Sequence, residues 1–271
     1  MDQKEHKEAR RRTAPKAAII YEAIRKEGEE ELTRTFSGLA WSGFAAGLSM
    51  GFSFLMEAFM LSNLSEFSWH AMVTKFGYSI GFLIVILGRQ QLFTENTLTP
   101  MLQLLNCKNL PTLKLVARLW SIVLIFNLLG ALVFALILCF SEPFNESVQD
   151  ALIVTSHKVF ESDFYKTFVN ALFAGWLIAL MVWLLPFAET ARVGVIIIIT
   201  YVVGLGGFAH IIAGSINAFF AVFAGLEPPL SFLTLFFIPT LIGNVIGGVA
   251  FVAAINHGAV RPEKPSCDIR V

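Results

Sequence analysis

The sequence predicts an all-α membrane protein with six transmembrane helices, arranged as an inverted repeat of three plus three. The 271 residues are 56% apolar and 15% charged, whereas soluble domains average about 45–50% and about 25%. Mean hydropathy is +0.69. The apolar residues fall into six segments long enough to cross a bilayer. The second and fifth segments, which are the middle members of two triplets, are interrupted by glycine and polar residues.

Three regions are predicted along the chain. Residues 1–34 comprise a charged tail and an amphipathic helix over 16–34 that lies at the membrane surface. Residues 35–257 form the six-helix transmembrane domain, and residues 258–271 form a polar tail. For the arginine-rich start of the chain we favour a solvated segment over one that contacts anionic lipid.

The first helix is predicted over residues 36–61. It carries Gly43, Gly47 and Gly51, a tandem GxxxG ridge that lets another helix approach closely. Glu57 lies near its far end, where we favour an interfacial carboxylate over a residue of a transport path.

The second helix is predicted over 71–106, with an interruption at 88–96. Exposed backbone groups at membrane depth are tolerated only where protein or an aqueous cavity surrounds them, so such an interruption points to a transport path. The other helices are predicted over 115–140, 165–186, 193–223 (with a glycine-rich interruption at 204–210) and 230–256; an acidic connection covers 141–163.

Lysine and arginine decide the orientation of such helices. Residues 1–34 carry nine of them, and the loop after the second helix has Lys108, Lys114 and Arg118 without an acid, whereas 141–163 is acidic. We therefore expect a multi-pass protein of the bacterial inner membrane with both termini cytoplasmic. Three helices per half put the halves in opposite orientation, so the two interruptions would meet near the midplane of the bilayer.

Several classes of protein are disfavoured. The formal net charge is zero, so no electrostatic footprint for nucleic acid is present outside the N-terminus. The three cysteines lie far apart without metal-ligand spacing. No phosphate-binding loop, catalytic triad or carboxylate pair stands out, so we expect no enzyme activity and no cofactor. The expected partners are the lipid bilayer and a small solute.

His210 is the sharpest candidate for chemistry. It is the one histidine inside a predicted span, and it sits at an interruption. In a soluble protein such a histidine is more often a hydrogen-bonded core residue, but an ionisable group inside a membrane is a functional-site hypothesis by default. Because histidine exchanges protons near neutral pH, it suits proton donation.

The first interruption offers further polar candidates. Thr94 can donate a hydroxyl to a substrate, or equally well cap the half-helix that starts near Thr97. For Arg89 and Glu95 we favour a mutual ion pair. The half-helix after Asn96 would direct its positive dipole end toward the path, which favours an anion.

The two interruptions resemble the formate/nitrite transporter family. Leu92–Thr94 is similar to that family's Leu-Phe-Thr, Gly207–His210 to its Gly-Phe-Glu-His, and Ala174–Trp183 to its fourth-helix signature. Lys158 falls near a basic residue ahead of helix four. The resemblance covers about residues 20–258, and the string Arg-Gln-Gln-Leu-Phe-Thr-Glu-Asn looks most like the YfdC-like branch.

The resemblance implies an aquaporin-like protomer, a homopentamer with one path per protomer, and passage of small monovalent anions such as formate, nitrite, lactate or hydrosulfide. It implies that Thr94 faces His210 between two apolar constrictions. From the residue types alone, we favour ordinary core packing over a constriction for the apolar side chains concerned. Position matching gives Tyr78 and Val203 for the outer constriction and Phe82, Leu92 and Phe93 for the inner one.

The sequence departs from the family pattern around the path. Ala209 stands where the family has an acid before the histidine, and Gly175 and Gly214 stand where it has asparagines. Val203 replaces an aromatic residue, while Arg89, Glu95 and Asn96 are additional polar residues. These departures affect the solute that passes more than the fold.

The sequence leads to the hypothesis of a channel or proton-coupled transporter for a small weak-acid anion, in which electropositive vestibules gather the anion and a proton neutralises it near the histidine. The alternative keeps the fold and passes a cation or a neutral solute. A third hypothesis is a non-conducting scaffold whose charged N-terminus recruits a partner.

Overall fold

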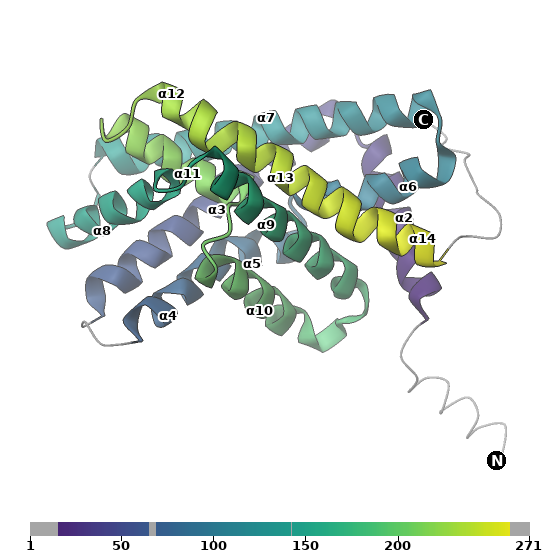
Figure 1. The fold of residues 1–271 in the computed structure, drawn as a ribbon, viewed down its shortest axis with the longest axis horizontal. Coiled ribbons are helices and arrows are strands. Elements are labelled where there is room, and N and C mark those ends of the chain that lie inside the picture. Colours follow the sequence, from purple (N-terminus) through teal and green to yellow (C-terminus); the bar gives the residue numbers. More distant parts are fainter. Residues whose placement is uncertain (1–15, 65–68, 142, 261–271) are drawn as a thin grey trace, which may run out of the picture.

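The computed structural model describes residues 16–64, 69–141 and 143–260, and in these ranges all regular structure is helical (Figure 1). The all-α prediction is thus confirmed for this part of the chain. Within it, five helical stretches are long and apolar enough to cross a membrane: Phe36–Asn63, His70–Leu87, Leu110–Ser141, Phe164–Phe187 and Pro229–Val260. The charged tail at 1–15 and the polar tail from 261 onward lie outside the described residues.

The helices follow one another with short connections. Their bounds are α2 (Ala17–Thr33), α3 (Phe36–Asn63), α4 (His70–Thr74), α5 (Ser79–Leu87), α6 (Thr99–Cys107), α7 (Leu110–Ser141), α8 (Glu146–His157), α9 (Phe164–Leu184), α10 (Arg192–Leu205), α11 (Ile211–Phe223), α12 (Pro229–Ser231), α13 (Ile238–Gly248) and α14 (Ile255–Val260). Two π-helical stretches, Phe232–Phe237 and Val249–Ala254, join α12, α13 and α14 into one continuous helix.

Glycines bring two pairs of helices into close contact. A Cβ atom at Gly47 of α3 would lie 2.1 Å from a backbone oxygen of α7, and one at Gly130 of α7 would lie 2.3 Å from a backbone oxygen of α3. In the same way, a Cβ atom at Gly175 of α9 would lie 2.2 Å from a backbone oxygen of α13, and one at Gly247 of α13 would lie 2.3 Å from a backbone oxygen of α9. The prediction that the glycines of the first helix admit a close neighbour is therefore confirmed, and a second pair repeats the contact.

The acidic connection at 141–163 contains a helix that its composition concealed. Asn145 caps α8 by accepting a hydrogen bond from the Val148 amide at 3.1 Å. Val148, Ala151, Leu152 and Thr155 are buried at helical spacing. The acids occupy the exposed face, so the high charge density hid an amphipathic pattern.

The amphipathic helix near the N-terminus forms as α2, and its buried face contacts protein. Tyr21, Ile24 and Gly28 are buried against α6, and a Cβ atom at Gly28 would lie 2.2 Å from the Thr99 carbonyl oxygen. The Tyr21 hydroxyl and His257 Nδ1 are 2.7 Å apart, which ties α2 to α14. Helices α2, α6 and α14 thus gather at one end of the molecule, and α8 and α12 lie at the other (Figure 1).

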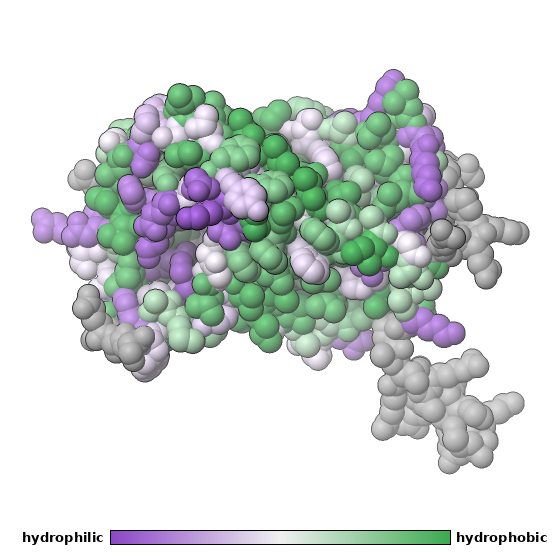
Figure 2. All heavy atoms as spheres, in the orientation of Figure 1, coloured by the Kyte–Doolittle hydropathy of each residue, from purple (hydrophilic) through white to green (hydrophobic). Residues whose placement is uncertain are grey.

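The surface has the distribution expected of a membrane protein. Hydrophobic residues cover the middle of the visible face, and hydrophilic residues gather toward the two ends of the long axis (Figure 2). Large apolar side chains such as Trp41, Phe140 and Ile198 are more than half exposed. Because monomeric soluble proteins rarely expose contiguous apolar areas of this kind, the face fits contact with lipid or with other subunits.

Candidate functional site

Two segments leave the helical conformation at the centre of the molecule. Residues 88–94 separate α5 from the turn before α6, and residues 206–210 separate α10 from α11. Both helices end in the same way, with a left-handed residue after the last turn: Arg89 has φ 53° and Gly207 has φ 62°. After the first helix the amide of Gln90 donates to the Val85 carbonyl at 3.0 Å.

In the second segment the Phe208 amide donates to the Val203 carbonyl, also at 3.0 Å. The two ends therefore share one hydrogen-bond pattern. They differ in residue type, because the left-handed position that glycine occupies in the second segment carries a long side chain, Arg89, in the first.

A buried asparagine holds each segment. Asn127 Oδ1 accepts from the Phe93 amide at 2.9 Å, and its Nδ2 donates to the carbonyls of Gly43 (2.7 Å) and Gln91 (2.9 Å). The bonds to Phe93 and Gln91 satisfy backbone groups that no helix pairs. Asn127 is fully buried on α7, so one side chain ties α3, α7 and the first interruption together.

Asn244 on α13 does the same for the second segment. Its Oδ1 accepts from the Ile211 amide at 2.9 Å, and its Nδ2 donates to the carbonyls of Ala171 (2.9 Å) and Ala209 (2.8 Å). The sequence analysis missed both asparagines. A polar residue alone in a long apolar helix is the signal that could have found them, because such a residue is unfavourable in a membrane unless it is paired.

Thr94 and His210 meet between the two segments. Thr94 Oγ1 lies 2.7 Å from His210 Nε2, and both residues are about 1% exposed. His210 Nδ1 accepts a hydrogen bond from the Ala213 amide at 3.2 Å, which caps α11. Since Nδ1 is an acceptor, the neutral ring carries its proton on Nε2 and donates it to Thr94 Oγ1.

This arrangement excludes one of the two roles considered for Thr94, and the other stays a prediction. Its side chain does not cap the half-helix, because the turn at Glu95–Thr97 has no side-chain cap. With its oxygen accepting from His210, the Thr94 hydroxyl keeps its own proton to donate. A solute at this point would therefore meet hydrogen-bond donors from two opposed segments.

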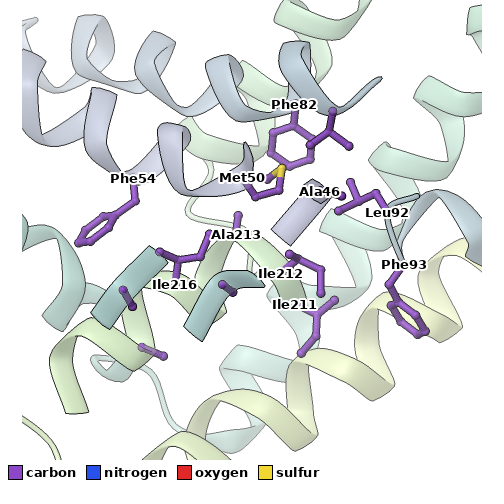
Figure 3. Close-up of a cluster of buried hydrophobic side chains, with 14 of the residues drawn as sticks. Ala46, Met50, Phe54, Phe82, Leu92, Phe93, Ile211, Ile212, Ala213 and Ile216 are labelled. Carbon is purple, nitrogen blue, oxygen red and sulfur yellow. The ribbon is translucent and has the colours of Figure 1, made fainter. Parts of the chain in front are cut away.

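Apolar side chains surround the pair. The Phe82 ring stands edge-on to the His210 ring, with centroids 5.0 Å apart and an interplanar angle of 77°. Phe82 and Leu92 are fully buried. Figure 3 shows Phe93 directed away from Phe82, and its ring packs against Trp120 at 5.9 Å.

One cavity reaches His210 itself. It has a volume of about 390 Å³, and we call it the His210 cavity. Tyr78, Val203 and Lys158 of the predicted site line it, and the Tyr78 ring packs on Phe82 at 5.3 Å. The structure thus brings Tyr78, Val203, Lys158 and His210 around one cavity. Phe93 does not line it.

The wall of the His210 cavity also holds an ion pair that the sequence analysis did not propose. Lys75 Nζ lies 2.5 Å from Glu57 Oε1, and Glu57 is 5% exposed. Glu57 therefore belongs to a partly buried ion pair beside the cavity, and its place at the membrane interface stays a prediction. The eighteen residues that separate the two charges hid their pairing from the sequence.

A second cavity, of about 740 Å³, lies under the N-terminal helix, and we call it the α2 cavity. Arg89 and Glu95 line it, but Arg89 pairs with Glu27 of α2 at 2.8 Å. The expected Arg89–Glu95 pair is therefore wrong, because α2 places a carboxylate within reach of the guanidinium. Asn96 lines neither cavity and donates from Nδ2 to Gln91 Oε1 at 3.0 Å.

Glu31 joins α2 to the first interruption. Its carboxylate accepts from the Gln91 side chain at 3.2 Å and from the Thr99 hydroxyl. Burial raises the pKa of Glu31 to about 7, since it disfavours the charged form more than these donors favour it. The sequence analysis missed this residue because nothing local distinguishes it from the other acids of α2.

The charges that line the two cavities balance in each case. The α2 cavity has four cationic and four acidic side chains: Lys26, Arg34, Arg89 and Arg192 with Glu27, Glu30, Glu31 and Glu95. The His210 cavity has Lys75 and Lys158 with Glu57 and Glu161. The expected electropositive vestibules are therefore not present as formal charge. No cluster of three or more His, Cys, Asp or Glu in the described ranges could hold a metal ion.

Comparison with known proteins identifies the family. A family model described as formate/nitrite transporter matches residues 18–258. The chain is 39% identical over 250 residues to the inner membrane protein YfdC of Escherichia coli (strain K12), with 92% of this chain and 81% of that protein covered. It is 29% identical over 247 residues to the formate channel BtFdhC of Bacillus thuringiensis, covering 86% and 91%.

Two solved structures share the fold. A pentameric formate channel with formate bound superposes with a TM-score of 0.68 at 18% identity, covering 88% of this chain and 99% of that one. An ion channel of the same family superposes with a TM-score of 0.77 at 17% identity, covering 89% and 98%. Given the family model and the 39% identical relative, this chain belongs to the formate/nitrite transporter family.

Proposed function

We propose that the protein is a channel or proton-coupled transporter for small monovalent weak-acid anions of the formate and nitrite kind. The observation that carries this proposal is the buried hydrogen bond between Thr94 Oγ1 and His210 Nε2, at 2.7 Å. It joins two non-helical segments, and one cavity reaches it. The formate channel among the relatives supports the class of solute.

The mechanism follows from the cost of a bare charge at membrane depth, which ranges from about 2.5 to above 10 kcal/mol. An anion that arrives from the His210 cavity replaces Thr94 as the acceptor of the Nε2 proton, and the Thr94 hydroxyl donates a second bond. The anion then takes a proton from water in that cavity, which leaves hydroxide in the water and His210 neutral throughout, and it passes the apolar side chains of Phe82 and Leu92 as a neutral acid. Tyr78 and Val203 narrow the approach, and Lys158 lies beside it.

The proposed architecture is an inverted repeat of two three-helix halves with broken second and fifth helices. Three matched features support it: left-handed helix ends at Arg89 and Gly207, the three-bond clamps of Asn127 and Asn244, and the reciprocal glycine contacts of α3–α7 and α9–α13. In both cases the asparagine accepts from a backbone amide two residues after the carbonyl to which it donates: Phe93 after Gln91, and Ile211 after Ala209.

The proposed assembly is a homopentamer in the inner membrane, with one path per protomer and both termini cytoplasmic. A solved relative of the same fold is pentameric, and the Escherichia coli relative is an inner membrane protein. The excess of lysine and arginine in the first 34 residues supports the orientation.

A neutral or cationic solute is the second candidate. The balanced charge of both cavities favours it, because an anion gains no attraction from a lining of zero net charge. Planar-bilayer reversal potentials under a salt gradient separate the two candidates, since anion and cation selectivity give opposite signs. A protein that passes no solute at all would instead support the scaffold hypothesis.

The principal experiment measures formate uptake into liposomes at about pH 5.5 and about pH 7.5, on either side of the ordinary titration of histidine. His210→Ala should abolish most of the uptake and its pH dependence. Because this change also removes the cap of α11, His210→Asn serves as a second variant that keeps an acceptor at the cap. His157→Ala, on α8 and outside both cavities, is the matched control. Unchanged rate and pH dependence in both His210 variants would overturn the mechanism.

A further inference from the structure

Helix α11 presents one stripe of residues to the His210 cavity. His210, Ala213, Gly214 and Asn217 all line it, at the spacing i, i+3, i+4 and i+7 of a single helix face. At a rise of about 1.5 Å per residue, Asn217 lies about 10 Å along the helix from His210. The cavity therefore reaches along two helical turns from the histidine, and the Phe236 ring packs against Gly214 between them.

Helix α9 adds polar groups to the same cavity. Thr167 and Asn170 line it at a spacing of one helical turn. Thr167 is 3% exposed, and its hydroxyl has no hydrogen-bond partner within the described ranges. Buried hydroxyl groups are nearly always paired, so this one points to a ligand or an ordered water. In those same ranges no hydrogen bond engages the side-chain amides of Asn170 and Asn217.

We propose that Thr167, Asn170 and Asn217 form a second binding site, for a small monocarboxylate, in the His210 cavity. The proposal rests on the proposed function and names the class of solute within it. The three side chains come from two helices that face one cavity, and they supply hydroxyl and amide N–H donors to carboxylate oxygens. Their amide oxygens also accept the O–H of the protonated acid, so the site takes the solute in either protonation state.

The charges in the same cavity balance. Glu57 and Lys75 neutralise each other through their ion pair. Lys158 and Glu161 also line the cavity, and neither enters an ion pair in the part of the chain described. Recognition of the solute is thus left to neutral hydroxyl and amide groups, which can donate to a carboxylate and accept from its protonated acid.

The test uses Thr167→Val, which removes the hydroxyl and keeps the shape of the side chain. Binding of sodium formate and sodium L-lactate to the purified protein is followed by the rise in melting temperature, with sodium chloride at equal ionic strength as reference. The same variants are assayed for the KM of carboxylate uptake into liposomes. We expect Thr167→Val to weaken binding and raise KM about tenfold, which is about 1.4 kcal/mol, and Thr167→Ser to stay close to wild type.

Thr240→Val is the matched control. Thr240 is fully buried on α13, its hydroxyl also has no partner in the described ranges, and it lines neither cavity. Wild-type affinity in Thr167→Val would overturn the proposal, because the hydroxyl would then face water only. An equal loss in Thr240→Val would overturn it as well, by showing a general effect of the missing hydroxyl.

The two proposals fail separately. If the wild-type protein passes no carboxylate but formate still raises its melting temperature in a Thr167-dependent way, the site stands and the transport function fails. If uptake persists and Thr167→Val has the KM of wild type, the transport function stands and the site fails. A response to chloride equal to that of formate would exclude a carboxylate site.

Discussion

Replacing Asn244 with leucine should loosen the second interruption and lower the stability of the whole protein. The side chain is fully buried and makes three hydrogen bonds of 2.8–2.9 Å, to Ala171, Ala209 and Ile211. Leucine has a similar volume and cannot make any of them. The change therefore leaves backbone groups at the interruption without their protein partners.

The magnitude can be worked out group by group. The Ala171 carbonyl lies inside α9 and keeps its helical hydrogen bond, so losing the second bond from Asn244 costs little stability. The Ala209 carbonyl and the Ile211 amide lie at the interruption, and each buried group left unpaired costs about 1–3 kcal/mol. The sum is roughly 2–6 kcal/mol, which corresponds to a fall of roughly 5–20 °C in melting temperature at about 2–4 °C per kcal/mol.

The assay is thermal unfolding of the purified protein in detergent, with Asn256→Leu as the matched control. Asn256 donates one local bond, to the Val252 carbonyl four residues earlier on the same helix, so its loss should shift the melting temperature by a few degrees at most. Asn127→Leu should lose about as much stability as Asn244→Leu, because it removes the matching three bonds. A melting temperature within about 2 °C of wild type for Asn244→Leu would refute the reasoning.

Three further predictions concern α2 and the buried ion pair. The raised pKa of Glu31 means that the folded protein binds this proton more tightly than the unfolded chain does, so the stability of the protein should fall as pH rises from about 4.5 to about 7. Melting curves of Glu31→Gln should show a weaker dependence of stability on pH. An unchanged dependence would contradict the assignment. Gly28→Leu should displace α2 from Thr99, which would appear as much faster tryptic cleavage after Lys26, whereas a wild-type digest would argue against close packing. Glu57→Leu should lower the stability of the protein by less than about 3–5 kcal/mol, which is the cost of removing one partner from a fully buried ion pair. Adding Lys75→Met should recover part of the lost stability. No recovery would mean that the two charges are not coupled.

Local sequence was sufficient for the apolar helices and for much of the site. Apolar segments become helices because backbone groups can be satisfied within a helix wherever water is absent, and this depends only on composition over about twenty residues. The glycines of the first helix indicated a close neighbour for the same local reason. The pairing of Thr94 with His210 came from the family resemblance and from the expectation that two interruptions would meet, and the structure brings the two side chains to 2.7 Å.

Composition misled where a charged face covers a buried one. Helix α8 lies in the acidic connection, and its acids are exposed while Val148, Ala151 and Leu152 are buried. The hypothesised mechanism also included electropositive vestibules, but folding brings as many carboxylates as cations to each cavity. A count along the chain cannot foresee this, because α2 approaches residues that follow it by about sixty positions.

The sequence by itself determined which apolar segments are helical, where polar residues interrupt them and to which family the interruptions are similar, because these properties depend on neighbours along the chain. Only the tertiary structure decided the partners: Arg89 with Glu27, Lys75 with Glu57, and the asparagines of α7 and α13 with the two interruptions. A hydrogen bond or ion pair requires two atoms within about 3 Å. Which atoms meet that condition depends on the packing of helices that lie far apart in the chain.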